Sequence, residues 1–440
     1  MEIKTLHDAE NLVYASFLQA QPYIPKADDS ITRNIHLTRQ LLDLAGAPDA
    51  GTRNILVTGS KGKGSTARFI ASLLSHHGYK VGLFTSPHLV NFTERIRVNG
   101  KAIPEDTFIR LMDTLAGSVH QVMAGLPRGK YLGPIGIILT AAYLYFKEQQ
   151  TDFNVIECGR GGRYDDTNVL DNEWAVLTPM TLEHVPQLGP TLEDIIHHKL
   201  GIVKAMTQKV FVGKQKKVLP DLEGKEMFCY QQAFTPRNVQ MSRAGLVFDV
   251  ETNKSSYDKL TLPLLGEFQA DNAALAIKVC EEIIGNPLEK GIIDTTFRDI
   301  QWPGRCEILA KDPIVLLDGA INRQSARYLT TVIEALDVSK VVTLIAVSED
   351  KDYLGVISVC ASFSETLIIT EPEHSHKSFP KDALNKAKQY QFKSMEIKPI
   401  KEAIATAYDL KPELILIVGT QTAIGEVKKI MGYNLLDIGM

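Results

Sequence analysis

Short apolar runs of strand length alternate with longer, helix-patterned segments over most of the chain. Strands that are buried on both faces read as continuous apolar runs, and parallel neighbours need a crossover helix between them. The alternation therefore predicts an α/β fold. A first series of strands is predicted at residues 54–59, 80–86, 153–159, 174–180 and 209–213. A second series is predicted at residues 314–319, 340–347, 365–370 and 413–419.

The segment between the two series has a different pattern. Residues 246–251 and 260–264 are predicted to be antiparallel strands, followed by one helix over about 270–284 and another from about 288. Pro303 and Gly304 then interrupt the pattern immediately before the second series begins. We therefore place a domain boundary near residues 298–305, which divides the chain into residues 1–300 and 301–440.

Composition narrows the class of protein. A length of 440 residues suits two or three domains, and 48 Lys+Arg against 52 Asp+Glu provide no overall positive field for nucleic acid or anionic membrane. The five cysteines are too widely spaced for a CxxC pair, so reduced, buried thiols are expected. The acidic N-terminal segment does not resemble a secretory signal, and the longest apolar run, residues 135–146, is too short to span a bilayer. These features predict a cytoplasmic protein.

The first predicted strand runs directly into a glycine-rich loop, GSKGKGST at residues 59–66, and the next twelve residues have helical spacing that ends at Gly78. Glycines let several backbone N–H groups face one point, and a helix N-terminus adds partial positive charge there. Lys63 would neutralise the β- and γ-phosphates of a nucleotide, and the Ser65 hydroxyl would ligate Mg²⁺. The spacing differs from the common G-x-x-x-x-G-K-[ST], so a glycine-rich turn that merely closes a strand is the alternative. We expect the phosphates of ATP to contact Gly59, Gly62, Lys63, Gly64, Ser65 and Thr66.

The segment GSKGKGSTARFIASLLSHHGYKVGLFTSPHLVNFTERIRVNGKAI resembles the opening of folylpolyglutamate synthases and dihydrofolate synthases, members of the Mur ligase superfamily. Their pattern is a GTNGKGST loop followed by a TSPHL segment and an ERI stretch. Later segments are also similar to motifs of this family. They are residues 157–168 (EVGLGGRLDATN), 182–184 (LDH), 188–191 (LGxT), 198–202 (EKAGI), 264–272 (LxGxHQxxN), 302–305 (WPGR) and 318–322 (DGAHN), with the family motif in parentheses.

This resemblance implies a P-loop, Mur-ligase-type central ATPase domain with an N-terminal helical segment in residues 1–300, and a Rossmann-like C-terminal domain in residues 301–440. The active site would lie in the cleft between them. The implied reaction is ATP-dependent amide formation, in which a substrate carboxylate attacks the γ-phosphate and an amine then displaces phosphate from the acyl phosphate. The expected partners are a folate-like carboxylate and an amino acid, L-glutamate, and family precedent favours a monomer.

The resemblance also implies a metal site. Glu157 and His184 match metal-binding residues of the family, and with Ser65 they would hold one or two Mg²⁺ ions. Glu157 ends a predicted buried strand, at the edge where α/β sheets present ligands. Lys199 aligns with a lysine that is commonly carbamylated in the superfamily, which would convert it into an anion for a second Mg²⁺. The alternatives are a solvated glutamate, an ordinary surface or core histidine and an amphipathic-helix lysine.

Four further residues would contact the nucleotide, by the same resemblance. Arg305 would reach toward the phosphates from the C-terminal domain, and Asp318 toward the ribose hydroxyls. Gln269 and Asn272 would contact the nucleotide from a helix of the ATPase domain. Arg305 could instead be a hinge residue with an exposed side chain. The residues expected to act in catalysis are Lys63, His184, Lys199 and Arg305.

Several positions depart from the family pattern. Isoleucine stands at 321 in place of the DGAHN histidine, and Arg323 replaces the proline that follows. Arg160 replaces the leucine of EVGLGG, Glu183 replaces the aspartate of LDH, and residues 130–134 read KYLGP where folate enzymes have TxFE. A folate ligase is the leading hypothesis. A paralogue that ligates an amino acid to a non-folate carboxylate, and an ATP-binding regulatory pseudo-enzyme, remain open alternatives.

Overall fold

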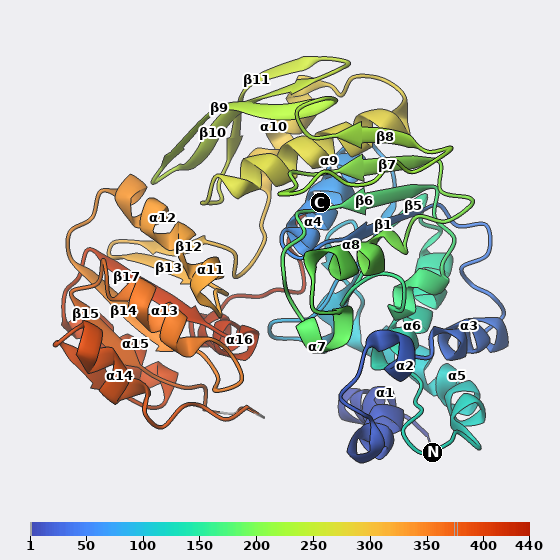
Figure 1. Cartoon of the computed structure of the whole chain (residues 1–440), viewed down its shortest axis with the longest axis horizontal. Helices are drawn as coiled ribbons and strands as arrows, with labels where there is room; N and C mark the ends of the chain where they lie inside the picture. The colour runs from blue at the N-terminus through green and yellow to red at the C-terminus, as the bar shows by residue number, and fades with distance from the viewer. Residues whose placement is uncertain (1, 374, 376) are drawn as a thin grey trace.

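The computed structural model describes residues 2–373, 375 and 377–440, whose strands form three sheets (Figure 1). The first sheet has the order β4-β3-β2-β5-β1-β6-β7-β8. Strands β2, β5, β1, β6, β7 and β8 are mutually parallel, and β3 pairs antiparallel with both β2 and β4. Its strands are β1 (Asn54–Thr58), β2 (Val81–Phe84), β3 (Ile96–Val98), β4 (Lys101–Ala102), β5 (Phe153–Glu157), β6 (Trp174–Leu177), β7 (Lys209–Val212) and β8 (Glu226–Cys229).

Helices cover both faces of the first sheet because successive strand residues point to opposite sides. Leu56 of β1 belongs to an apolar core with the N-terminal helices, whereas its neighbours Ile55 and Val57 pack against α4 (Lys63–His76). The face of the sheet opposite α4 carries the N-terminal helices and several later ones. They are α1 (Leu6–Ala20), α2 (Asp29–Thr32), α3 (Ile35–Leu44), α5 (Glu105–Met123), α6 (Pro134–Gln149), α7 (Val185–Leu188) and α8 (Leu192–Leu200), with the short 3₁₀ turns η1 (Gln21–Tyr23), η2 (Phe92–Arg95) and η3 (Asp166–Val169).

The second sheet is antiparallel and lies beyond α4, at the top of Figure 1. Its strands are β9 (Phe234–Ser242), β10 (Gly245–Thr252) and β11 (Ser256–Leu262). Helices α9 (Phe268–Ile284) and α10 (Lys290–Asp299) fill the space between this sheet and α4, and all of them share one apolar core. The beginning of α9 is thereby held against the phosphate loop.

The third sheet has the order β12-β13-β17-β14-β15-β16, and only β12 runs antiparallel. Helices α11 to α14 pack on one face and α15 and α16 on the other. The strands are β12 (Glu307–Lys311), β13 (Ile314–Asp318), β14 (Val341–Ala346), β15 (Thr366–Ile369), β16 (Ser394–Glu396) and β17 (Leu414–Gly419). The helices are α11 (Arg323–Ala326), α12 (Tyr328–Leu336), α13 (Tyr353–Cys360), α14 (Ala383–Tyr390), α15 (Ile400–Asp409) and α16 (Gln421–Ile430).

After α16 the chain returns to the first sheet, and the C-terminus lies beside α4 in Figure 1. The buried guanidinium of Arg68, on α4, donates to the backbone carbonyls of Ile438 (2.8 Å) and Gly439 (2.9 Å). Burial lowers the pKa of Arg68 to about 9, so its charge depends on these carbonyl dipoles for compensation. The tail therefore ties the part of the chain that carries the third sheet to the first.

Every strand that was predicted from the sequence is present, and six further strands (β3, β4, β8, β9, β12 and β16) were missed. The first predicted helix, α4, begins at Lys63, four residues earlier than its helical spacing indicated, and Gly78 follows it with φ +89° as expected of a cap. The thiols are all free, but Cys229 is only partly buried, which corrects the expectation that all five are buried. Among the described residues, no helix has the length and apolarity needed to cross a membrane.

Candidate active site at the carboxyl edge of the first sheet

The predicted site residues gather where β1, β5 and β6 end. β1 lies between β5 and β6, and all three run in parallel. The chain leaves β1 into α4 on one face of the sheet, whereas α6, which precedes β5, covers the other face. Oppositely directed connections leave a crevice outside the carboxyl ends of the strands, which is the usual ligand position in open α/β sheets.

The phosphate loop requires glycine at two positions. Gly59 has φ +148°, and a Cβ there would lie 1.9 Å from Oγ1 of Thr178. Gly62 has φ +83°, and a Cβ there would lie 2.5 Å from Oδ1 of Asn272. Left-handed backbone and close approach both exclude larger residues. The loop is therefore fitted between the segment after β6 and the start of α9.

The N-terminus of α4 forms the floor of the site. Gly62 is its N-cap and has no side-chain partner, so the first N–H groups of the helix remain free for an anion. Lys63 Nζ donates to the carbonyl oxygen of Gly59 (3.0 Å) and forms no ion pair with any carboxylate in the described residues. Ser65 and Thr66 are buried, and Thr66 Oγ1 lies 3.4 Å from Oδ1 of Asn272.

Glu157 lies against this helix terminus from the end of β5. A Cβ added to Gly64 would be 3.4 Å from Glu157 Oε2, which also accepts the N–H of Ser86 (3.1 Å). Burial raises the pKa of Glu157, and the charge of Lys63 opposes that rise. The Glu157 carboxylate beside Gly64, together with the Ser65 hydroxyl of the next residue, supplies the oxygen donors that Mg²⁺ prefers.

His184 comes from the segment after β6 and is exposed, with φ +49° at the start of α7. Partial desolvation lowers its pKa, so the imidazole is neutral at pH 7 and its lone pair is free. Over the described part of the chain, no three His, Cys, Asp or Glu side chains form a group that could hold a metal by themselves. The residues present thus fit a Mg²⁺ ion that takes its remaining ligands from phosphate and water.

Lys199, on α8, is buried next to the phosphate loop. Its Nζ donates to the carbonyl oxygen of Gly59 (2.7 Å) and to Glu183 Oε1 (3.0 Å). Burial and the charge of Lys63 lower the pKa of Lys199 to about 8. Burial acts to raise the pKa of Glu183, but Lys199 and Lys63 outweigh it and hold that pKa below its usual range. The sequence marked Glu183 only as a departure, and its role as the partner of Lys199 was missed.

Gln269 and Asn272 lie in the first turns of α9, and Asn272 approaches the loop at Gly62. Asn272 Nδ2 donates to Gln269 Oε1 (3.0 Å), and both side chains are buried. Gln269 Nε2 is buried and has no hydrogen-bond partner in the structure. An unpaired buried donor is costly. Because this Gln269 Nε2 donor lies beside a phosphate loop, we expect a bound ligand to supply its hydrogen-bond acceptor.

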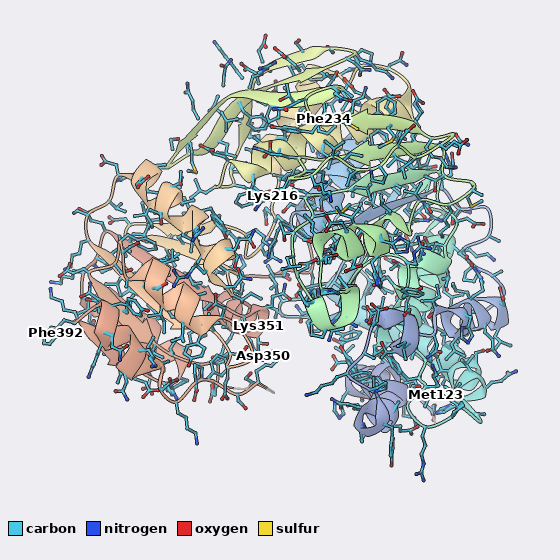
Figure 2. The ribbon with its side chains drawn as sticks, viewed as in Figure 1. Met123, Lys216, Phe234, Asp350, Lys351 and Phe392 are labelled. Atoms are coloured by element: carbon cyan, nitrogen blue, oxygen red, sulfur yellow. The ribbon has the colours of Figure 1, made fainter. Side chains whose placement is uncertain are left out.

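Residues of the third sheet face the same place. Asp350 and Lys351, which follow β14, lie on the side of this sheet that faces the first one, whereas the 91% exposed Phe392 lies on the far side (Figure 2). Arg305 lines a pocket that also contains Gly64, Glu157 and Trp302. Its Nη1 donates only to the carbonyl oxygen of Gly304 (3.1 Å), so it keeps free donors.

Asp318, at the end of β13, is buried, and burial raises its pKa. It accepts the N–H groups of Cys306 (3.0 Å) and Ala320 (2.7 Å), so it already fixes the turn around it. Lys61, which sequence analysis passed over, also belongs here. Burial lowers its pKa, and the charges of Glu183, Lys63, Arg305 and Asp318 all act on it.

Comparison with known proteins identifies the family. The sequence model of the Mur ligase middle domain matches residues 110–280. The dihydrofolate synthase/folylpolyglutamate synthase of Bacillus subtilis is 30% identical over 412 residues, which cover 89% of this chain and 93% of that protein. This chain belongs to the folylpolyglutamate synthase and dihydrofolate synthase family.

Solved structures agree in fold. A Mycobacterium tuberculosis folylpolyglutamate synthase complexed with ADP and AMPPCP superimposes with a TM-score of 0.82 at 23% identity, covering 96% of this chain and 99% of the other. A folylpolyglutamate synthase–AMPPCP complex gives 0.77 at 27% identity, covering 94% and 99%. The α/β fold predicted from the sequence is confirmed, and family membership makes the chain an ATP-dependent ligase that forms amide bonds.

Three of the positions that depart from the family pattern have different partners. Ile321 is partly buried, and its N–H donates to Ser325 Oγ (3.1 Å). Arg323 is exposed at the start of α11, and its N–H donates to Asp352 Oδ2 (2.9 Å). Arg160, in contrast, is held in an ion pair with buried Asp29.

Proposed function

We propose that this protein activates the carboxyl group of a folate-type acceptor with ATP and joins it to L-glutamate. The supporting observation is the convergence of two cations, Lys63 and Arg305, on one sheet edge. Lys63 and Arg305 have no carboxylate partner in the described residues. Uncompensated positive charge at a helix N-terminus is suited to a triphosphate. The name of the Bacillus subtilis relative supports folate as the acceptor class.

ATP would be held by the loop and by α9, with the ribose directed toward Asp318. The AMPPCP complex of a relative supports this assignment. The proposed nucleotide contacts are Gly59, Gly62, Lys63, Gly64, Ser65, Thr66, Gln269, Asn272, Arg305 and Asp318. One or two Mg²⁺ ions, held by Ser65, Glu157, His184 and Lys199, would neutralise developing charge on the phosphates when bound. In this scheme residues 1–300 form the ATPase domain and residues 301–440 the C-terminal domain.

In the first step an oxygen of the acceptor carboxylate attacks the γ-phosphorus and ADP leaves. The second step forms the amide when the amine of glutamate attacks the acyl carbon, loses a proton and expels phosphate. Lys63 and Arg305 would offset the negative charge that brings carboxylate and phosphate into repulsion. Approach of the third sheet to the first would exclude water from the acyl phosphate, which hydrolyses when exposed.

Lys199 is proposed to be carbamylated in the working enzyme. A carbamate forms on a neutral amine, and a pKa of about 8 leaves a useful fraction of this amine neutral near pH 7. The carbamate would lie beside Glu183, so a cation must separate the two anions. Carbon-13 NMR with labelled bicarbonate tests this proposal: a carbamate signal that Lys199→Arg removes is expected, and no signal with Mg²⁺ present would contradict it.

Isotope transfer tests the function itself. An acceptor labelled with oxygen-18 in its carboxyl group, supplied with ATP and L-glutamate, should yield labelled phosphate and a product that mass spectrometry identifies as the glutamate amide. Unlabelled phosphate would exclude the acyl phosphate. Turnover with non-folate acids alone would support the paralogue, and ATP binding without turnover would support the regulatory protein.

A further inference from the structure

Arg160 forms a bidentate ion pair with a buried carboxylate. Its Nε donates to Asp29 Oδ2 (3.0 Å) and its Nη2 to Asp29 Oδ1 (2.5 Å), which is a bidentate pair between the loop after β5 and α2. The Asp29 side chain is 2% exposed, whereas that of Arg160 is 27% exposed. The carboxylate thus anchors the guanidinium from the protein interior and leaves its outer edge toward solvent.

A second ion pair, between Arg33 and Asp166, lies beside the first. Arg33 Nη1 is 3.5 Å from Asp166 Oδ2, and its Nε is 3.8 Å from Asp29 Oδ1. Two arginines and two aspartates therefore neutralise one another. Tyr131, which belongs to the altered segment 130–134, lies close enough for all four charges to act on it. Two separate departures from the family pattern, Arg160 and this segment, thus meet at one place.

The outer edge of Arg160 remains available. In residues 2–373, 375 and 377–440, no protein group accepts a hydrogen bond from its Nη1. Arg160 is three positions beyond Glu157, and its charge acts on His184, so this edge lies beside the reaction centre. In the proposed function Lys63 and Arg305 serve the phosphates. Arg160, whose Nη1 has no acceptor in the described residues, is a cation available to the acceptor.

We propose that Arg160 binds a second carboxylate of the acceptor, next to the carboxyl group that is activated. The enzyme would then favour acceptors that end in glutamate, which carry two neighbouring carboxylates, over acids with a single carboxyl group. The two hydrogens on Nη1 can bind a carboxylate while Asp29 fixes the plane of the guanidinium. Leucine, the residue of the family pattern, offers no donor at this position. This inference rests on the proposed function and specifies its acceptor.

The test compares two acceptors, a folate that ends in glutamate and dihydropteroate, which has one carboxyl group. In Arg160→Leu, kcat/KM for the glutamate-ended acceptor should fall at least about 10-fold, mainly through KM, while that for dihydropteroate changes less than about 3-fold. Arg160→Lys should recover part of the loss. The control is Arg110→Leu, which removes an exposed pair with Glu148 on α5 and α6 and should change neither value. Equal losses for both acceptors, or none, would overturn the proposal.

Folding and function are separated by two further measurements. Arg160→Leu leaves the buried Asp29 carboxylate paired only with Arg33. If this single variant does not fold, the double variant Asp29→Asn/Arg160→Leu, which also removes that buried charge, takes its place in the experiment. Calorimetry with p-aminobenzoylglutamate and p-aminobenzoate, in the presence of a non-hydrolysable ATP analogue, needs no turnover. Tighter binding of p-aminobenzoylglutamate that depends on Arg160 would support the inference even if folate turnover failed. Equal binding of both probes would refute it while leaving the proposed function standing.

Discussion

The two ends of helix α9 carry polar residues of opposite character. Toward its C-terminal end, Lys278, Glu281 and Glu282 form a closed ionic cluster within the protein. At its N-terminal end, Gln269 and Asn272 face the phosphate loop, and a buried donor of Gln269 has no partner. One helix thus carries a self-sufficient charge cluster at one end and a buried polar group with an unmatched donor at the other.

The closed cluster satisfies its own members. Lys278 Nζ lies 3.2 Å from Glu281 Oε2 and 2.7 Å from Glu282 Oε1, and its side chain is fully buried. Further donors complete both carboxylates: Lys209 (2.6 Å) and Lys254 (3.0 Å) on Glu282, and the hydroxyl of Tyr257 (2.7 Å) on Glu281. Each member of this cluster is paired with another described residue, so the cluster holds the second sheet to α9 and β7.

The phosphate site, which this open end of α9 faces, leaves positive charge available to another molecule. Lys63 bonds only a backbone carbonyl, and Arg305 does the same from across the site. Buried polar groups are normally paired, so unpaired ones gathered at a helix N-terminus are evidence of a binding site. The comparison shows that completeness of pairing, more than charge itself, distinguishes a site from scaffold.

The largest expected effect comes from the open end. Lys63→Ala should lower kcat for ATP-dependent ligation at least about 1,000-fold, because the transferring phosphoryl group loses a charge partner. Its unfolding free energy should stay close to wild type, since Lys63 makes no ion pair in the described structure. Steady-state phosphate release and urea unfolding measure the two quantities. Near-normal turnover would remove the phosphate loop from the mechanism.

Substitution in the closed cluster of Lys278, Glu281 and Glu282 should lower the unfolding free energy and leave turnover unchanged. Lys278→Ala leaves two buried carboxylates short of a cation and should cost about 3–5 kcal/mol of unfolding free energy. Lys290→Ala, which breaks the exposed pair with Asp294, is the control and should cost less than about 1 kcal/mol. Urea unfolding of both variants gives the comparison. The kcat of the folded fraction of Lys278→Ala should be unchanged. A loss of kcat in that fraction would contradict the claim that the Lys278 cluster contributes to stability alone.

Sequence predicted those parts of the fold and site that are contiguous in the chain. Most strands of the two parallel arrays were found because each is a continuous apolar run. The parallel strands β8 and β16 were missed, and β16, with the sequence SME, carries too little apolar pattern to be recognised. The phosphate loop was found because its glycines and Lys63 occur within eight residues. The pairing of Arg160 with Asp29 spans 131 positions. The pairing of Lys199 with Glu183 depends on how α8 packs. Neither of these two pairings could therefore be predicted from the local sequence pattern.

A smaller effect at the open end separates binding from stability. Gln269→Leu removes the buried donor that lacks a partner, but it also removes the acceptor of Asn272 Nδ2 (3.0 Å), so the two effects oppose each other and the unfolding free energy should change by less than about 1 kcal/mol. The KM for ATP should rise about 10-fold, because a hydrogen bond to the nucleotide is lost. Thermal unfolding and initial rates at varied ATP test both. Asn253→Leu, which removes an acceptor of Lys278 at the closed end, should show the reverse pattern of lost stability and unchanged KM.

The smallest effect is a pH dependence of the closed end. Burial acts to raise the pKa of Glu282, but hydrogen bonds from Lys209, Lys278 and Lys254 outweigh it and lower the pKa to about 2. Because this folded-state pKa lies below the ordinary value of 4.5, the carboxylate stabilises the fold fully above pH 4.5. That contribution is lost as the pH falls from 4.5 toward 2.

Glu282→Gln should therefore differ from wild type in unfolding free energy by a constant amount above pH 5, and the difference should shrink steadily below pH 4.5. Glu223→Gln, at an exposed glutamate, is the matched control and should follow wild type throughout. Urea unfolding at a series of pH values gives both curves. A difference that does not shrink in acid would mean that Glu282 stabilises the fold through packing and not through its charge, and the closed cluster would then no longer be the electrostatic opposite of the phosphate site.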